Sequence, residues 1–300
     1  MTADPVHAPV TRFADVGSVT LAYETFGDPA GEPLVLVMGL ATQMIAWPDP
    51  LCRALADLGH HVIRFDNRDI GLSTHLDGLP TPKPWDTLLP HRRPPYSLDD
   101  MADDTVGLLD ALGLESAHLV GASLGGFIAQ TVAVRHPDRV RSLSLVMTST
   151  GSRRVGLPSP RAALVLLRRP PTPDREAAIQ MRIDTFRVIG SPGYPLDETY
   201  VRDLAGRSYD RAFDPAGVTR QLAAAMSQPD RTRALAGVRV PTVVMHGLDD
   251  PLIHPSGGRA LAQAIPGARF VGFPGMGHDL PAALWPQYVD EIASVTGRGH

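Results

Sequence analysis

Short apolar runs alternate with amphipathic segments over the first half of the chain. The amphipathic segments, at 47–58, 97–112 and 126–136, carry apolar residues at helical spacing and predict helices. Runs of four to eight β-forming residues that end at glycine, proline or polar clusters predict strands, and the first of them opens the sheet. The predicted strands are 19–26, 34–38, 62–65, 117–120 and 140–147. Repeated strand–helix alternation favours an α/β fold with a mostly parallel, doubly wound sheet.

The alternation stops near residue 150 and resumes near residue 237. Prolines and arginines are frequent in 151–174, and apolar residues at helical spacing follow without a strand signal. Strands at 240–245 and 269–273 and helices at 257–265 and 282–295 then complete the pattern. We therefore expect a core made of 1–149 and 237–300, with 150–236 inserted as a helical cap. A proline-rich stretch at 77–95 predicts a long irregular loop, a candidate wall of the pocket.

Composition narrows the classes of function. The chain has 300 residues, 43% of them hydrophobic and 20% charged, which suits a globular protein with a sizeable core. A net charge of −4 argues against a nucleic-acid partner. The single cysteine, Cys52, excludes an internal disulfide and a thiolate metal cluster. With no leader-like start and no apolar run long enough for a membrane span, we expect a cytoplasmic protein.

A serine stands in a Gly-x-Ser-x-Gly pattern at the junction of a predicted strand and a predicted helix. Gly121, Ser123 and Gly125 form the pattern. In this context the serine occupies a strained turn that lifts its hydroxyl above the edge of the sheet, and side chains at the flanking glycines would collide with neighbouring elements. We interpret Ser123 as a nucleophile.

A serine hydroxyl needs a base to take its proton, and the base needs a carboxylate to orient it. Asp250 and His278 each follow a predicted strand, so their loops emerge at the same sheet edge as Ser123. The order Ser, Asp, His is that of α/β-hydrolases. Asp249 is the alternative acid, while His246 and His254 are the nearest alternative bases. Asp66 and Arg68 also follow a strand, but we expect them to brace their turn.

An oxyanion hole completes such a site, and two backbone N–H groups suffice for it. One is expected from Leu124, directly after the nucleophile, and the other from the loop after the strand at 34–38, at Leu40. Neither a cofactor nor a metal is predicted.

These residues resemble those of the α/β-hydrolases over about 19–296. The segments 37–39, 47–49, 61–69, 71–73, 250–251 and 274–278 are similar to those of the bacterial esterases that include aclacinomycin methylesterase. Where many α/β-hydrolases have His-Gly before the oxyanion residue, this chain has Met38-Gly39, a change that this subgroup shares. The resemblance implies a serine esterase in which Ser123, Asp250 and His278 form the triad. The cap matches less specifically, so methyl-ester hydrolysis of a polyketide is one candidate reaction.

Two alternatives to esterase activity stay open. The same triad could serve perhydrolysis, C–C bond hydrolysis or thioester cleavage. Alternatively, the fold could bind a small ligand as a receptor with little turnover. The expected partner is a small-molecule ester, and the oligomeric state is left open.

Overall fold

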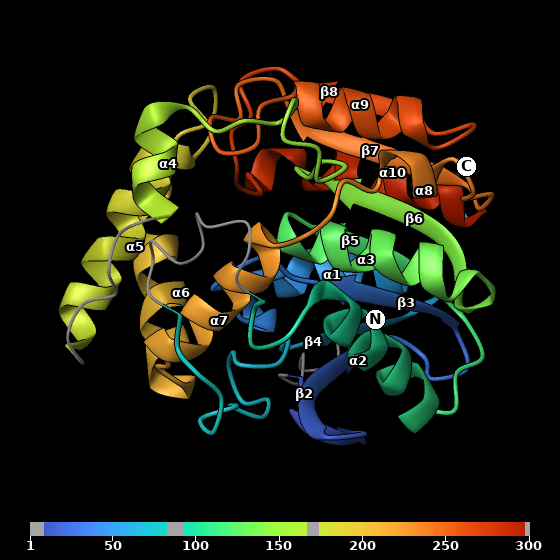
Figure 1. The fold of residues 1–300 in the computed structure, drawn as a ribbon, viewed down its shortest axis with the longest axis horizontal. Coiled ribbons are helices and arrows are strands. Elements are labelled where there is room, and N and C mark those ends of the chain that lie inside the picture. The colour runs from blue at the N-terminus through green and yellow to red at the C-terminus, as the bar shows by residue number, and fades with distance from the viewer. Residues whose placement is uncertain (1–8, 83–92, 167–173, 298–300) are drawn as a thin grey trace, which may run out of the picture.

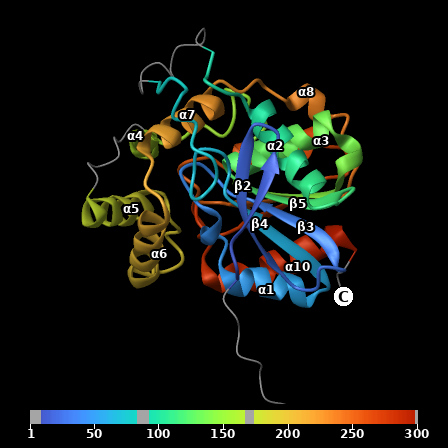
Figure 2. The same ribbon diagram turned by 90° about the horizontal axis from the view of Figure 1, so that it is seen from below.

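A computed structural model describes residues 9–82, 93–166 and 174–297 of the chain (Figures 1 and 2). An eight-stranded sheet in the order β1-β2-β4-β3-β5-β6-β7-β8 forms its centre. The strands are β1 (Arg12–Val16), β2 (Val19–Phe26), β3 (Glu32–Val37), β4 (His60–Phe65), β5 (Ala117–Ala122), β6 (Val140–Val146), β7 (Thr242–Gly247) and β8 (Arg269–Phe273). β2 pairs antiparallel with β1 and β4, and the remaining pairs are parallel. The predicted mostly parallel sheet is confirmed.

Helices cover both faces of this sheet, and two separate apolar clusters fill the space beneath them. One cluster packs α2 (Leu98–Ala111), α3 (Leu124–Arg135) and α9 (Ser256–Ala264) on one face. The other packs α1 (Asp49–Asp57) and α10 (Trp285–Thr296) on the opposite face. β3 contributes Val35 to the first cluster and Leu36 to the second. Because alternate strand residues point to opposite faces, such continuous apolar runs fit a sheet that is covered on both sides.

Between β6 and β7 the described residues form helices and no strand. They are α4 (Pro160–Leu166), α5 (Arg175–Ile189), α6 (Glu198–Arg211), α7 (Pro215–Met226) and α8 (Thr232–Leu235). In both views α4, α5 and α6 lie to one side of the sheet, while α7 is closer to it (Figures 1 and 2). Ile179 and Ile183 are buried together with Val201, so α5 and α6 share a small apolar core of their own.

Two sequence expectations about the sheet were wrong. The sheet opens one strand earlier than expected, at β1. Only Ala14 and Val16 of this short strand are buried, whereas Phe13 is 59% exposed, so its apolar alternation is weak. β7 begins at Thr242 rather than at residue 240, because Pro241 has no N–H to donate to a neighbouring strand.

Two further features concern the loops and the helices. The described parts of the proline-rich stretch, 77–82 and 93–95, contain no helix or strand, and 83–92 lie outside the described residues. No helix in the described parts of the chain combines the length and the apolar character needed to cross a bilayer.

Candidate active site

Ser123 lies on a tight turn between β5 and α3. Its backbone adopts φ 53° and ψ −116°, a conformation that non-glycine residues rarely occupy. The flanking glycines permit this turn. A Cβ at Gly121 would come within 2.4 Å of the Gly125 carbonyl oxygen, and one at Gly125 within 2.0 Å of the Val37 carbonyl oxygen. The Ser123 side chain makes no capping bond to α3, which leaves its hydroxyl available to other groups.

Three side chains form a continuous chain of hydrogen bonds at the carboxyl ends of the parallel strands. The Nε2 atom of His278 lies 3.1 Å from Ser123 Oγ, and its Nδ1 atom lies 2.8 Å from Asp250 Oδ2. With Nδ1 protonated, His278 donates to the carboxylate, and its Nε2 atom is left to accept the serine proton. His278 and Asp250 are both buried, whereas Ser123 is partly exposed. The structure thus brings these three predicted residues together.

The carboxylate of Asp250 is fixed by groups on both of its oxygens. Its Oδ1 atom accepts hydrogen bonds from the backbone N–H groups of Leu252 at 2.8 Å and Ile253 at 2.9 Å. Burial works to raise the pKa of Asp250, but the His278 and His246 rings outweigh it and hold that pKa well below its usual range. The group therefore stays ionised opposite His278.

The alternative acid and bases lie elsewhere. Asp249 is exposed, and its Oδ2 atom accepts a hydrogen bond from the Gly275 N–H at 2.8 Å. His254 is exposed and bonds to Ser256. His246 contacts the Ile253 carbonyl at 2.7 Å and lies 3.5 Å from Asp250 Oδ2. The sequence analysis named His246 only as an alternative base and missed its contact with Asp250, which the four-residue spacing could have suggested.

The two positions expected to form an oxyanion hole flank Ser123. Leu124 begins α3, and the first N–H groups of a helix have no intrahelical partner. The loop after β3 passes close to the serine, because a Cβ at Gly39 would lie 3.2 Å from Ser123 Cβ. Leu40 follows in this loop. Asn67 Nδ2 donates to the Met38 carbonyl at 3.1 Å and so holds the start of the loop.

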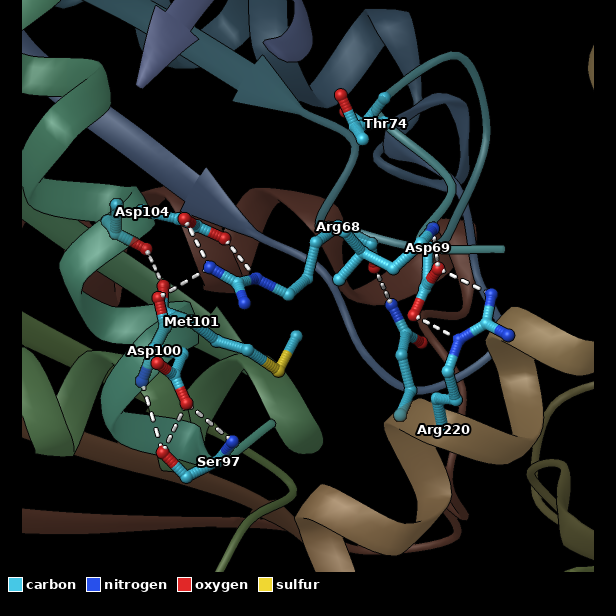
Figure 3. Close-up of polar contacts among 12 residues, drawn as sticks. Arg68, Asp69, Thr74, Ser97, Asp100, Met101, Asp104 and Arg220 are labelled. Carbon is cyan, nitrogen blue, oxygen red and sulfur yellow. Dashed lines mark hydrogen bonds and ion pairs between the residues drawn. The ribbon is translucent and has the colours of Figure 1, made fainter. Parts of the chain in front are cut away.

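The acidic loop after β4 is engaged in internal contacts, as the sequence led us to expect. Asp66 accepts from the Met44 N–H at 2.7 Å and forms an ion pair with Arg211 of α6 at 3.0 Å. Arg68 forms a two-pronged pair with Asp104 of α2 at 2.6 and 2.7 Å. In Figure 3 Arg68 extends toward Asp104, whereas Asp69 extends in the opposite direction, toward Arg220 on α7. The loop is therefore held on two sides, by α2 and by α6 and α7.

The segment that follows α5 supports the loop that carries His278. The Ile189 carbonyl accepts a hydrogen bond from the His278 N–H at 2.7 Å. Ser191 Oγ accepts from the Gly277 N–H at 2.8 Å and donates to the Asp279 carboxylate. A Cβ at Gly277 would lie only 2.3 Å from the Gly190 carbonyl oxygen, so the two segments are in direct backbone contact. Nothing in the sequence pattern indicated this contact.

Two groups of acidic and histidine side chains within the described residues are close enough to hold a metal ion. In the first, His118 bonds to Ser142 and Glu32, and His60 bonds to Thr296. The second contains Asp69, His75 and Asp214, where the Arg220 guanidinium lies 2.7 Å from Asp69 and already supplies the positive charge. These internal contacts account for both groups without a metal ion.

A cavity of about 420 Å³ opens beside the Asp250 loop. Phe186 of α5 and Ser191 of the segment after it form one wall, and Asp249 and Pro251 form another. Its walls do not include Ser123 or His278, so this cavity is not assigned to the reacting ester.

The nucleophile turn, the order of strands and the Ser-His-Asp geometry define an α/β-hydrolase. The family model described as "alpha/beta hydrolase fold" matches residues 32–174, and the chain belongs to that family. It is 33% identical to the rhodomycin D methylesterase DauP of Streptomyces sp. (strain C5), over 91% of this chain and 94% of that protein. It is 31% identical to the rhodomycin D methylesterase DnrP of Streptomyces peucetius, with the same shares covered.

A solved structure supports the fold independently. The enol-lactonase from Burkholderia xenovorans LB400 superposes with a TM-score of 0.72 at 24% identity, over 95% of this chain and 100% of that chain. At this level of identity the likeness is one of fold.

Proposed function

We propose that this carboxylic ester hydrolase acts through Ser123, His278 and Asp250 as a catalytic triad. The observation that carries the proposal is the hydrogen-bond chain from Ser123 Oγ through both ring nitrogens of His278 to the Asp250 carboxylate. Attack by Oγ on the ester carbonyl passes the serine proton to His278 Nε2, and Asp250 stabilises the imidazolium. The backbone N–H groups of Leu40 and Leu124 stabilise the negative oxygen of the tetrahedral intermediate.

Collapse of this intermediate completes the first half of the reaction. His278 returns its proton to the leaving alcohol, and the acyl group stays on Ser123 as an ester. His278 then takes a proton from water, the resulting hydroxide attacks the acyl-enzyme, and the second collapse releases the carboxylic acid and regenerates the serine hydroxyl. No step requires a cofactor or a metal.

For the substrate we propose the methyl ester of a polyketide. Support comes from the two rhodomycin D methylesterases, whose identity extends over almost the whole of both chains. We also propose that residues 150–236 act as a cap over a core of 1–149 and 237–300, since α4 to α8 all lie between β6 and β7. A small-molecule ester is the expected partner.

A labelling experiment tests the triad proposal. A fluorophosphonate probe should modify the wild-type protein at Ser123 and leave Ser123→Ala unmodified. A series of p-nitrophenyl esters should then be turned over many times per molecule, whereas a receptor would release at most about one equivalent. Absence of labelling at Ser123 would overturn the proposal. Incubation with rhodomycin D and detection of the demethylated acid by mass spectrometry tests the substrate.

A further inference from the structure

Arg182 of α5 differs from the other arginines of the three long helices between β6 and β7. Every other arginine in α5, α6 and α7 forms an ion pair with a carboxylate, namely Arg175, Arg187, Arg202, Arg207, Arg211 and Arg220. Arg182 donates to a neutral acceptor, the Ala41 carbonyl, at 2.7 Å, and has no carboxylate partner among the described residues. Among the arginines of α5, α6 and α7, Arg182 is thus the one whose charge no carboxylate of the described residues neutralises.

The position of Arg182 directs it toward the catalytic site. Ala41 directly follows Leu40, and Gly39 in the same loop lies against Ser123. Seven residues after Arg182, α5 ends at Ile189, whose carbonyl contacts His278. Seven residues are two helical turns, so the two contacts lie on the same side of α5, about 10 Å apart. Helix α5 therefore spans the site from the loop after β3 to the His278 loop.

The contact with Ala41 leaves most of the Arg182 donors unused. A guanidinium has five N–H groups, and one of them accounts for the Ala41 carbonyl. The Ala41 peptide, at φ 57°, is also held from α7, because its N–H donates to Gln221 Oε1 at 3.2 Å. Gln221 is itself fixed, since its Nε2 atom donates to the Arg68 carbonyl at 2.8 Å. The loop thus has a support other than Arg182.

Burial of an unpaired cation is unfavourable, so its retention in contact with the loop after β3 points to a ligand of opposite charge. Burial lowers the pKa of Arg182, as expected for a guanidinium without a carboxylate. Arg182 as a residue is only partly buried.

We propose that Arg182 binds an anionic oxygen group of the substrate, a carboxylate or a phenolate, located several atoms from the ester carbonyl that Ser123 attacks. This inference rests on the proposed function. Arg182 would act as a specificity-determining residue, because a guanidinium binds an anionic oxygen through charge-assisted hydrogen bonds that a neutral group does not offer.

Matched pairs of p-nitrophenyl esters test the proposal. Each pair combines the monoester of a dicarboxylic acid, which carries a free carboxylate, with the uncharged fatty-acid ester of the same chain length. The measured quantity is the ratio of kcat/KM for the charged ester to kcat/KM for the neutral ester. The wild-type ratio should fall by about tenfold or more in Arg182→Met at the best chain length and recover partly in Arg182→Lys. Arg202→Met, which removes an exposed pair with Glu176, is the matched control and should leave the ratio unchanged.

The outcomes separate this inference from the function on which it rests. An equal fall for both esters in Arg182→Met would assign Arg182 to support of the Ala41 loop and overturn the anion site. An unchanged ratio would overturn it as well. Fluorophosphonate labelling of each variant shows that Ser123 is intact, and a wild-type protein that neither labels nor turns over esters would contradict the proposed function instead.

Discussion

The backbone N–H of His278 donates to the carbonyl of Ile189, the last residue of α5, at 2.7 Å. The loop of the expected base is therefore held by a segment that belongs to the region inserted between β6 and β7. Ser191 adds a second support through Gly277 and Asp279. Alignment of His278 with Ser123 thus depends on both parts of the chain.

Ser191→Ala tests this dependence. Loss of the hydroxyl leaves the Gly277 N–H without its acceptor, so we expect kcat to fall by about tenfold to a hundredfold with little change in KM for a small ester. Ser191→Thr keeps a hydroxyl and should retain most of the rate. Steady-state kinetics on p-nitrophenyl acetate measure both constants. A rise in KM alone would indicate that Ser191 acts in substrate binding instead.

The two neighbouring aspartates should differ sharply when each is changed to asparagine. Asp250→Asn removes the charge opposite His278 and should lower kcat by about 10⁴-fold, as loss of a triad carboxylate does elsewhere. Asp249→Asn affects only the contact with the Gly275 N–H and should keep activity within a few-fold. Equal losses in the two variants, or a larger loss in Asp249→Asn, would contradict the proposed acid.

The strained turn at Ser123 predicts that glycine is tolerated better than alanine at this position. Glycine adopts φ 53° without the steric cost that a Cβ imposes, whereas alanine keeps that cost. Ser123→Gly should therefore be more stable than Ser123→Ala by about 1 kcal/mol, and both should be inactive. Urea unfolding followed by circular dichroism gives the two free energies of unfolding. A less stable glycine variant would show that this turn is relaxed.

Removal of one charge from the ion pair between Asp69 and Arg220 should destabilise the fold much more than removal of both charges. Both side chains are buried, and two hydrogen bonds of 2.8 and 2.7 Å join them. Arg220→Met leaves the Asp69 carboxylate buried without its main partner, at a cost of about 3–5 kcal/mol. The double variant Asp69→Asn with Arg220→Met removes both charges and should recover much of the loss. Thermal unfolding of the wild type, Asp69→Asn, Arg220→Met and the double variant completes the cycle, and additive losses would contradict the prediction.

His75 should stabilise the folded state more at acidic pH than at alkaline pH. Burial works to lower its pKa, but the contacts with the Gly71 carbonyl and Asp214 outweigh this and raise the pKa above the usual 6.5. A raised pKa means that the stabilisation is fully present below about pH 6.5 and is lost as the pH rises through the folded-state pKa. His75→Gln should cost about 0.5–1 kcal/mol at pH 5.5 and less at pH 9. His254→Gln, at an exposed ring, provides the control for thermal unfolding at the two pH values.

Much of the sheet and the positions of the three triad candidates could be predicted because each has a local signal. Most of the strands read as short apolar runs, and the candidates Ser123, Asp250 and His278 each follow a predicted strand. Contacts between distant segments have no such signal. Arg211 reaches Asp66, and Arg182 reaches Ala41, across more than a hundred residues. Their partners depend on how α5 and α6 pack, which helical periodicity does not specify.

The ion pairs that join α6 and α7 to the loop after β4 limit how this enzyme can be recombined with its relatives. A chimera that received only residues 150–236 from another family member would keep Asp66 and Asp69 buried while exchanging Arg211 and Arg220. The loop after β4 therefore has to be exchanged together with residues 150–236. Buried carboxylates in that loop that lost their guanidinium partners would destabilise the chimera. Exchange of the helices between β6 and β7 thus requires two separate stretches of sequence to vary together.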